Sequence, residues 1–328
     1  MEINYVCPKT KKQLIKQSDG LLTNDGIIYP FIRGHNNLNI PNFLIVQEHG
    51  EAAKQALVMY DHKSSTKIYR NFLDWLFLTF DEDESIFRAN LLAKLKLQKG
   101  YKVLITGCGL GDDIRQIIDV IGSDGVVHAN DLAAEMVVAA SHYVMLNQPN
   151  SKNIFLSVCD AQNLPFSDNY FDAAFHFGGI NLFDNIKLSI EEMERVVRPG
   201  GRVVFGDEGV APWLRNIEYG RIAINNNSLW AATAPLDLLP RYCMDVHLSW
   251  VLGNCFYVID FEVSDSGPYM NKDMGHKGTR GGSMRTRYFG QLEGVTEESK
   301  NFVLEDAERK GISIHDWLEQ VINEKKQL

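Results

Sequence analysis

A glycine-rich segment at residues 106–111 constrains the fold of this chain more than any other feature. It reads Thr-Gly-Cys-Gly-Leu-Gly, follows a short apolar run at 103–105 and precedes an amphipathic helical pattern over 112–121. This order predicts a strand that turns through glycines into a helix. Because glycine has no Cβ, the backbone of such a turn can approach a ligand closely. Glycine-rich turns also occur in α/β domains that bind nothing, so the segment alone leaves both possibilities open.

Acidic residues end the next two predicted strands. Residues 125–131 end in Asp131, 20 positions after Gly111, and residues 154–160 end in Asp160. In nucleotide-binding α/β units, a carboxylate at the end of the second strand accepts hydrogen bonds from ribose hydroxyls. Asp131 also occupies the N-cap position of a helix that we expect to begin at Leu132, and one carboxylate can serve both roles.

The following segments continue an alternating α/β pattern. We predict a fourth strand at 169–177, a helix at 191–198 that Pro-Gly-Gly ends, and a fifth strand at 202–206. A sixth strand is predicted at 255–261 and a seventh at 288–293. The pattern therefore predicts an α/β fold.

Four segments of the chain together resemble the class I S-adenosylmethionine-dependent methyltransferases, and especially the ubiquinone/menaquinone C-methyltransferase-like group of small-molecule enzymes. They read VLITGCGLGDD, HANDLAAEM, CDAQNLPFSDNYFDAAF and VVRPGGRVVF, and the resemblance covers roughly residues 85–210. It implies a Rossmann-like seven-stranded sheet with helices on both faces. It also implies S-adenosyl-L-methionine as the cofactor and S-adenosyl-L-homocysteine as the product.

The resemblance assigns cofactor contacts residue by residue. Gly107, Gly109 and Gly111 would face the methionine part and the ribose. Asp131 would hold the ribose hydroxyls, and Asp160 would accept a hydrogen bond from the adenine amino group. The other contacts that it implies are Leu132, Ala161, Phe177 and Gly178.

One position departs from the family pattern. The family usually carries an acid two residues before the first glycine, where it helps to fix the loop and the amino end of the cofactor. Ile105 stands at that position here. The methionine ammonium would then need another partner, such as Asp112, Asp113 or a backbone carbonyl.

Residues 1–45 lie outside the predicted nucleotide fold. Short apolar runs separated by turns, with a hairpin signal at Asp25-Gly26, predict a small β segment. The segment resembles the zinc-ribbon-like domain that precedes some methyltransferases, in which two cysteine pairs hold a metal. Cys7 is its only cysteine and Thr10 occupies the partner position, so a four-ligand zinc site of that type cannot form. We expect a degenerate ribbon that packs or acts as a lid, with a partner-binding surface as the alternative.

Residues 46–98 carry apolar side chains at helical spacing and are expected to form a helical lid. In enzymes of the resembled family such helices lie over the cofactor, and Tyr60 or Tyr69 would cover its methionine tail. We assign residues 99–295 to the cofactor-binding domain. The charged, amphipathic tail at 296–328 is expected to be helical and to pack on the sheet or in a dimer contact.

The acceptor site is expected after the fifth strand. Asp207 and Glu208 follow that strand, where ligands collect in open α/β sheets, although solvated turn acids would give the same pattern. Residues 216–253 are expected to form a helical insertion that caps the acceptor. The pocket residues predicted for this region are Trp213, His247 and Trp250.

Residues 275–287 form a dense basic, glycine-rich stretch. We expect this loop to join the last two strands and to close over an anionic acceptor through His276, Arg280 and Arg285. Guanidinium groups suit that role because they pair with carboxylates and phosphates through two hydrogen bonds. A hairpin loop with solvated charges is the alternative.

Composition agrees with a soluble enzyme. A net charge of −9 disfavours binding to nucleic-acid backbones, which relies on clustered Lys and Arg. No apolar run reaches transmembrane length, and five scattered cysteines indicate a reduced, cytoplasmic protein. The resemblance implies methylation of a small molecule, with specialised metabolism as one setting. We expect a monomer or homodimer that needs no metal, nucleic-acid or membrane partner.

The expected reaction is an in-line displacement at the sulfonium methyl group, in which positioning of the two reactants supplies much of the rate. A base must reach the proton of the acceptor, and the candidates are, in order, Glu208, His176 and His247. Two other functions stay open. The ribbon-like N-terminus suggests an RNA methyltransferase, and Ile105 suggests a protein that keeps the cofactor fold without transferring methyl groups.

Overall fold

The computed structural model describes residues 3–44, 50–147, 152–279, 281–289 and 295–327. The chain divides into two compact units, Met1–Gly267 and Pro268–Leu328. This division differs from the expected domain at 99–295, because the segment after Gly267 makes its contacts within the second unit.

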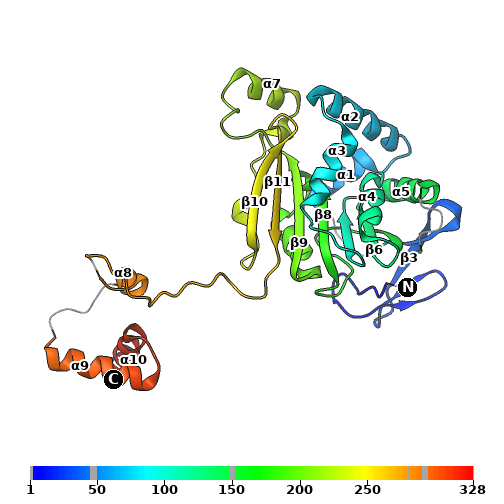
Figure 1. Ribbon diagram of the computed structural model, residues 1–328. Helices are drawn as coiled ribbons and strands as arrows, with labels where there is room; N and C mark the ends of the chain where they lie inside the picture. The colour runs from blue at the N-terminus through cyan, green and yellow to red at the C-terminus, as the bar shows by residue number, and fades with distance from the viewer. Residues whose placement is uncertain (1–2, 45–49, 148–151, 280, 290–294, 328) are drawn as a thin grey trace. The chain divides into compact units, whose positions relative to one another are not determined.

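The first unit is built on a seven-stranded sheet with the order β10-β11-β9-β8-β5-β6-β7 (Figure 1). Five consecutive strands of this order, from β9 to the edge strand β7, are parallel. They are β5 (Lys102–Thr106), β6 (Val126–Asp131), β7 (Ile154–Val158), β8 (Phe171–Phe177) and β9 (Val197–Glu208). β11 (Phe256–Glu262) pairs antiparallel with β9, and β10 (Met244–Val251) pairs antiparallel with β11. The predicted Rossmann-like α/β fold is confirmed.

The strand at the edge beside β11 is not the one expected. Within the segment predicted at 288–293, Tyr288 lies in helix α8 (Met284–Phe289), and 290–293 fall outside the described residues. The edge strand is β10, which lies inside the segment expected to be a helical insertion. A short turn at 252–255, with positive φ at Leu252 and Asn254, folds β10 directly back onto β11. The rest of that segment holds α7 (Glu218–Asn226), η4 (Ser228–Ala231) and η5 (Leu236–Leu238).

Helices cover both faces of the sheet. α4 (Asp112–Ile121) and α5 (Ala134–Asn147) pack against β6 and β7, while α6 (Ile186–Val196) packs against β8 and β9. The isoleucines predicted to line α4 are buried in the first of the two cores that result. Each fully buried side chain of this size contributes roughly 1.5–3 kcal/mol to folding. None of the described helices is long and apolar enough to span a membrane.

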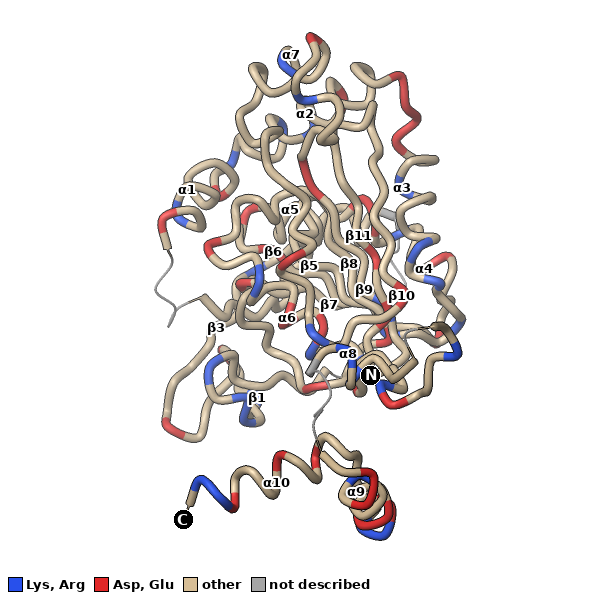
Figure 2. The backbone as a smooth tube through the Cα atoms, turned by 90° about the vertical axis from the view of Figure 1, so that its left-hand side faces the viewer, with Lys and Arg blue, Asp and Glu red and all other residues tan. Residues whose placement is uncertain are grey.

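The leading segment forms three helices, α1 (Glu51–Tyr60), α2 (Ser65–Phe80) and α3 (Glu84–Ala93). Figures 1 and 2 show α2 and α7 at the same end of the sheet. Aromatic rings join the two regions, since Trp230 of η4 lies 5.9 Å from Phe80 and 6.5 Å from Trp75 of α2, centroid to centroid. The helix α2, before the parallel strands in the chain, and η4, after them, are therefore in contact at this end of the sheet.

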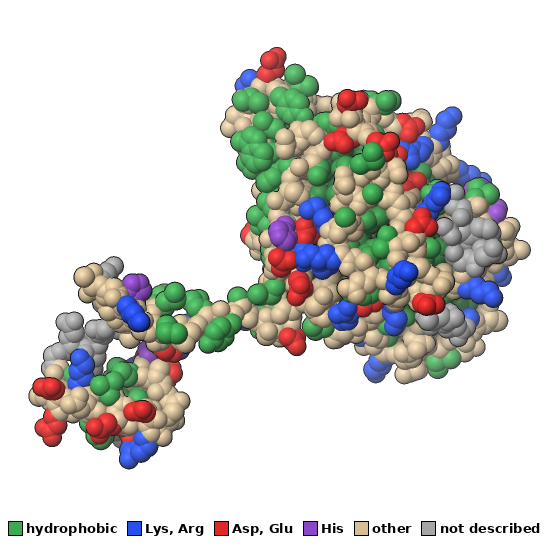
Figure 3. Space-filling view, viewed as in Figure 1, with side chains coloured by type: hydrophobic (Ala, Val, Ile, Leu, Met, Phe, Trp, Pro, Cys, Tyr) green, Lys and Arg blue, Asp and Glu red, His purple; other side chains and the backbone are tan. Residues whose placement is uncertain are grey.

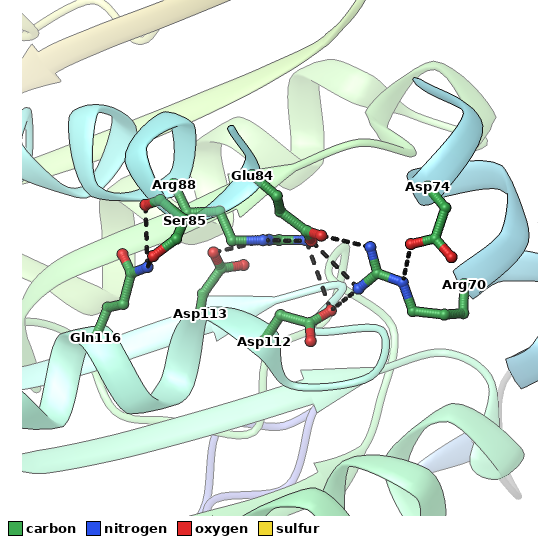
Figure 4. A network of polar contacts seen from close by, with 8 residues as sticks. All are labelled: Arg70, Asp74, Glu84, Ser85, Arg88, Asp112, Asp113 and Gln116. Carbon is green, nitrogen blue, oxygen red and sulfur yellow. Dashed lines mark hydrogen bonds and ion pairs between the residues drawn. The ribbon is translucent and has the colours of Figure 1, made fainter. Parts of the chain in front are cut away.

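A network of ion pairs ties α2 and α3 to the start of α4 (Figure 4). The Arg88 guanidinium donates to Asp113 at 2.9 Å and to Glu84 at 2.8 Å. Arg70 pairs with Glu84 and lies 3.7 Å from Asp112. Because the network is largely shielded from solvent, it orients these helices more firmly than exposed pairs would.

The N-terminal segment forms a small antiparallel sheet that packs on the α6 face. Its strands are β1 (Ile15–Lys16), β2 (Gly20–Leu22), β3 (Ile28–Arg33) and β4 (Asn39–Pro41), and η1 (His35–Asn37) precedes the last of them. Phe43 is fully buried in the second core, which also contains Phe166 and Ile190 of the larger domain. The Phe43 N–H donates to the carbonyl of Val158 at 2.9 Å. The small sheet is therefore part of the core of the first unit.

Cys7, the single cysteine of the ribbon-like segment, is packed against a tyrosine. The Cys7 thiol is buried, and its Sγ lies 3.4 Å from the Tyr29 hydroxyl oxygen. Over the described ranges, no group of three or more His, Cys, Asp or Glu residues is arranged to hold a metal ion.

Replacing Tyr5 with phenylalanine will lower the free energy of unfolding by about 1–2 kcal/mol. The Tyr5 hydroxyl lies 3.0 Å from Nε2 of His128, whose pKa burial lowers to about 3, so the hydroxyl shares a hydrogen bond with a neutral imidazole. Phenylalanine keeps the ring contacts with Phe43 and Phe166 but leaves Nε2 buried without a hydrogen-bond partner. Urea unfolding measures the change, with Tyr242→Phe at an exposed site as the control. Equal stability of the two variants would contradict the expectation.

The second unit consists of three helices, α8, α9 (Glu297–Lys310) and α10 (Ile314–Lys326). Asp306 is buried within it, accepts a hydrogen bond from the Trp317 indole at 2.6 Å and pairs with Lys310 at 2.7 Å. These donors lower the pKa of Asp306, the Lys310 ammonium most. The tail is helical, as expected, and this buried carboxylate holds α9 and α10 together.

Candidate active site

A cavity of about 420 Å³ lies at the carboxyl ends of the parallel strands. Its walls come from the glycine-rich loop, from the ends of β6 to β9, from α1 and α2, and from η4. Ligands collect at this edge of open α/β sheets because the loops that follow the strands leave a crevice there. All of the predicted cofactor contacts except Gly111 line the cavity.

The glycine loop has the backbone that its sequence predicts. Gly107 and Gly109 have φ values of +61° and +51°, which residues other than glycine rarely adopt. A Cβ on Gly109 would lie 3.2 Å from the Tyr69 ring, so any side chain there would obstruct the cavity. Gly111 has another role, since a Cβ on it would lie 3.1–3.2 Å from Ile114 and Ala140. It allows α4 to approach α5 and does not face the ligand space.

Asp131 fixes the loop from the neighbouring strand. One carboxylate oxygen accepts from the Gly109 N–H and the other from the Ala133 N–H, both at 2.9 Å. The capping role is thus present, although α5 begins at Ala134 and not at Leu132. Burial raises the pKa of Asp131, and these N–H donors oppose that shift by stabilising the ionised form. The carboxylate still borders the cavity, where it can accept from ligand hydroxyls.

The polar groups of the cavity stand in a row. Asp160 accepts from the Gln162 N–H at 2.9 Å in the turn after β7. Across the sheet from β7, the next strand end carries Asp131 (β6), and Gly107 follows β5. His176 on β8 and Glu208 at the end of β9 complete the row. All five line the same cavity. Such a row suits an elongated ligand that lies across the strand ends, with a nucleoside at the β7 side.

His176 has a fixed tautomer. Its Nδ1 lies 2.9 Å from the carbonyl oxygen of Thr106, so Nδ1 carries the hydrogen and donates. Nε2 is buried and has no hydrogen-bond partner among the described residues. Burial lowers the pKa of His176 to about 4, which keeps the ring neutral at physiological pH and makes it a poor general base. The ring borders the cavity, but Nε2 itself has almost no accessible surface.

The two acids after the fifth predicted strand are buried at the end of β9 and are not solvated turn residues. Asp207 is used structurally, since it accepts from the Asn181 N–H at 2.7 Å and from the Glu208 N–H at 2.8 Å. The Glu208 carboxylate has a weak contact with the Asn227 amide at 3.4 Å. Burial, and to a smaller extent the neighbouring Asp207, raise the pKa of Glu208 to about 7, and the Trp230 side chain opposes this shift. Glu208 thus has the proton affinity of a general base at neutral pH.

Helix α1 covers the cavity and is latched at both ends by carboxylates. Asp184 accepts from the N–H groups of Gly50 and Ala52 at 2.8 and 3.0 Å, and so caps the start of α1 from the loop before α6. Asp61, just after α1, accepts from the Glu135 N–H at 2.9 Å and so caps the start of α5. In both contacts a carboxylate is stabilised at a helix N-terminus, and together they hold α1 over the strand ends.

Replacing Asp184 with alanine will weaken binding of S-adenosyl-L-homocysteine about fivefold, mostly through faster dissociation. An N-cap of this kind contributes about 1 kcal/mol, and its loss frees one end of α1 from the domain below. Stopped-flow fluorescence measures the dissociation rate. Glu51→Gln, in the first turn of α1, is the control because it leaves the Asp184 contacts in place. An unchanged rate in Asp184→Ala would show that α1 does not gate the cavity.

Several predicted acceptor residues lie elsewhere. His247 is on the edge strand β10, half exposed, with Nδ1 3.1 Å from Asp260. Trp250 lies on the same strand and Trp213 packs against it at 5.1 Å, centroid to centroid. Neither tryptophan lines the cavity, and Trp213 is exposed. Figure 3 shows hydrophobic side chains gathered on the surface at the α7 end of the first unit. For His247 and Trp250 the reason is that β10 is the outermost strand of the sheet, and β11 separates it from the parallel strands whose ends form the cavity.

The basic stretch falls in the second compact unit, whereas the residues that line the cavity belong to the first. His276 and Arg285 belong to the second unit, where Arg285 pairs with Asp273 at 2.8 Å and the His276 Nδ1 accepts from the Gly278 N–H at 2.9 Å. Arg280 lies outside the described residues. Because the last strand pair closes through a short turn at 252–255, the basic stretch is not the loop between two strands.

The N-terminal sheet contributes no described residue to the cavity, so it packs without acting as a lid. Asn130, Arg88 and Phe256 are among the lining residues that the sequence did not indicate. Asn130 precedes Asp131 and has both amide atoms buried without a partner among the described residues. Arg88 and Phe256 come from α3 and β11, which approach the site only through the tertiary fold. A polar residue inside an apolar strand was the one available signal, and it applies to Asn130 alone.

The matches to known proteins concentrate on the same region. Residues 103–201 match a family described as a methyltransferase domain. The chain is 34% identical over 124 residues to a demethylmenaquinone methyltransferase of Staphylococcus epidermidis, which covers 38% of this chain and 49% of that protein. It is 37% identical over 109 residues to a ubiquinone/menaquinone biosynthesis C-methyltransferase of Cellvibrio japonicus, which covers 33% and 43%. The chain thus spans about half the length of the curated relatives it matches.

A solved structure shares the fold over a longer stretch. Phosphoethanolamine N-methyltransferase 2 of Haemonchus contortus, solved in complex with S-adenosyl-L-methionine, matches 77% of this chain and 71% of its own. Its TM-score is 0.52 at 14% sequence identity, which shows a common fold. The glycine loop, the two strand-end carboxylates and the matched family agree. The chain therefore carries a class I methyltransferase domain, whose cofactor is S-adenosylmethionine.

Proposed function

We propose that this protein transfers a methyl group from S-adenosylmethionine to a small-molecule acceptor. The observation that carries the proposal is a single cavity that connects the nucleoside-binding acids to Glu208. A cofactor held at one end of such a cavity would have its reactive group near an acceptor at the other end. Catalysis would then follow from alignment of the two reactants.

The residues present fit the cofactor. Asp160 would accept from the adenine amino group, Asp131 would bind the ribose hydroxyls, and Gly107 and Gly109 would leave room for the chain that follows. When bound, the cofactor supplies a methyl group on a positively charged sulfur. The protein contributes acidic groups around it, and an acidic site stabilises a cationic ligand.

The acceptor end of the cavity is mostly apolar, and its walls include Leu57, Phe72, Leu73, Leu229 and Phe256. Among the described residues that line the cavity, Arg88 is the one Lys or Arg, and its guanidinium is held by Glu84 and Asp113. We therefore propose a neutral, largely apolar acceptor in place of the anionic one considered from the sequence. The printed names of the curated relatives, which refer to demethylmenaquinone, ubiquinone and menaquinone, agree with an apolar acceptor.

Glu208 is the proposed general base. It would remove a proton from an acceptor hydroxyl or acidic carbon as the methyl group is transferred, because a neutral nucleophile that loses its proton is attracted to the sulfonium. Its raised pKa and the absence of a strong partner among the described residues leave it free to accept that proton.

Two measurements test the proposed function. Calorimetry should detect S-adenosyl-L-homocysteine binding, and Asp131→Asn should weaken it. A panel of hydroquinones, phenols, amines and carboxylates is then incubated with S-adenosylmethionine, and formation of methylated product is followed by mass spectrometry. We expect methylation of neutral hydroxyl-bearing aromatics. Failure to bind S-adenosyl-L-homocysteine at high micromolar concentration would refute the proposal, whereas methylation of carboxylates alone would refute the neutral acceptor.

A further inference from the structure

One short segment places two N–H donors beside Glu208, and the following inference rests on the proposed function, in which Glu208 is the base. The segment consists of Asn227 and η4, which follow α7 in the chain. It is tied to the end of β9, because the Val210 N–H donates to the Trp230 carbonyl oxygen at 2.8 Å. Val210 lies two residues after Glu208, so this backbone contact brings the segment next to the carboxylate.

The side-chain amide of Asn227 is the first donor. Asn227 is the N-cap of η4, and its Oδ1 accepts from the Leu229 N–H at 3.0 Å. Because Oδ1 serves the helix cap, Nδ2 is the end of the amide that can donate, and it lies 3.4 Å from Oε1 of Glu208. This length is beyond the usual range for N–H donors, so the contact is a weak one.

The indole of Trp230 is the second donor, and aromatic packing fixes its position. The ring is buried, stacks on Phe80 at 5.9 Å and packs against Phe256 at 5.6 Å, centroid to centroid. Nε1 is buried and makes no hydrogen bond of ordinary geometry with the described residues. A buried tryptophan N–H usually has a partner, and one without it costs free energy.

The Glu208 carboxylate is the group on which this N–H acts. Burial and the neighbouring Asp207 raise the pKa of Glu208 to about 7, and the Trp230 side chain lowers it as a hydrogen-bond donor. A donor has this effect because it stabilises the ionised form of a carboxyl group. Packing and electrostatics therefore place the indole N–H toward Glu208, just beyond ordinary hydrogen-bond geometry.

The titratable neighbours of Glu208 ionise at other pH values. Burial raises the pKa of Asp207 to about 6, so Asp207 ionises before Glu208 does. Tyr60 of α1 and Tyr257 of β11 also face the two acids, and burial raises the pKa of both phenols, that of Tyr60 to about 12. Both tyrosines are therefore neutral over the pH range in which Glu208 titrates.

We propose that Trp230 is a positioning residue for the proposed base: its Nε1–H, assisted by the Asn227 amide, holds the Glu208 carboxylate in its ionised form at the acceptor end of the cavity. Ionised Glu208 would draw the indole N–H into a shorter hydrogen bond, and protonated Glu208 would release it. Trp230 is not among the residues that line the cavity, so it acts through Glu208 and not on a ligand.

The ligand-free wild-type protein provides the first test. The chain has five tryptophans, and Trp230→Phe identifies the Trp230 signal among the indole N–H resonances in a 1H–15N spectrum. We expect this resonance to move downfield as pH rises through about 7, the pKa of Glu208, because a charged acceptor forms the shorter and stronger hydrogen bond. In Glu208→Gln this movement should be lost.

Titration of Glu208 itself is the second test, followed through 13C-labelled glutamate carboxyl groups. Trp230→Phe keeps an aromatic ring and removes the donor, so the midpoint should rise by about one pH unit. Asn227→Ser keeps a capping oxygen, lacks Nδ2 and should raise the midpoint by less. Trp75→Phe is the matched control, since it makes the same change in a ring 6.5 Å from Trp230 and should leave the midpoint in place.

Thermal unfolding identifies any variant that does not fold, and the wild-type indole titration does not depend on the Trp230→Phe protein being stable. An indole resonance that stays fixed, or that moves equally in Glu208→Gln, would overturn the proposal. An unchanged Glu208 midpoint in Trp230→Phe, or an equal rise in Trp75→Phe, would do the same. Because these titrations contain no cofactor, failure of the wild type to bind S-adenosyl-L-homocysteine would refute the proposed function separately.

Discussion

Replacing Asp131 with alanine will reduce the affinity for S-adenosyl-L-homocysteine at least about 100-fold. Two effects combine. The proposed ribose contacts are hydrogen bonds to a charged acceptor, which contribute about 1.5–3 kcal/mol each. In addition, the Gly109 N–H loses its acceptor at 2.9 Å, so the loop that cradles the cofactor is no longer fixed to β6. Isothermal titration calorimetry measures the loss directly.

The control for this variant is Asp124→Ala, which removes an exposed acid from the turn before β6. Asp131→Ala should also unfold more easily by about 1–2 kcal/mol, because the Ala133 N–H at the start of α5 loses its cap. Circular dichroism will show whether the fold is retained. Affinity within about threefold of the wild-type value, in a folded variant, would remove Asp131 from the cofactor site.

Replacing Glu208 with glutamine will lower kcat by about 10²- to 10⁴-fold, which is the usual contribution of a general base. It will also remove one limb of the pH profile. In the wild type the base must be ionised, so kcat/KM should rise with pH and level off above about 7, the pKa of Glu208. In Glu208→Gln the residual rate should be flat through this range. A retained limb, or unchanged turnover, would assign proton removal to another group.

The same substitution should make the protein more stable at alkaline pH. Glu208 has its pKa raised from 4.5 to about 7 in the folded state, so the folded protein binds this proton more tightly than the unfolded chain does. Stability therefore falls as pH rises from about 4.5 to 7 and stays lower above that range. Glutamine carries no charge, so we expect Glu208→Gln to gain roughly 1–3 kcal/mol at pH 8 and almost nothing at pH 4. Urea unfolding at the two pH values measures the difference.

The cofactor half of the site could be predicted because its signals are local. Gly107 and Asp131 each end a strand and open a turn, and parallel strands bring such ends to one edge of a sheet. Gly111 was misplaced because a glycine that admits a ligand and one that admits a neighbouring helix look alike in sequence. Only the contacts with Ile114 and Ala140 separate the two cases.

The acceptor half depends on contacts between distant parts of the chain. β10 alternates apolar and polar residues, as His247 and Trp250 illustrate. Its pairing with β11, however, depends on the turn at 252–255, and no pattern in the longer sequence indicates it. Once β10 takes the edge position, the basic stretch loses its expected place between two strands. The burial of Glu208 likewise comes from helices and loops that no strand pattern identifies.

The contact between the small N-terminal sheet and β7 has a consequence for solubility. Asn42 bridges Val158 in parallel register and Phe43 donates to its carbonyl, so the last strand of the large sheet has part of its outer edge covered. An uncovered edge offers free N–H and C=O groups that recruit strands from other molecules. A chain shortened to begin after residue 44 should therefore form oligomers through intermolecular strand pairing. By covering this edge, the small N-terminal sheet would protect the protein from aggregation.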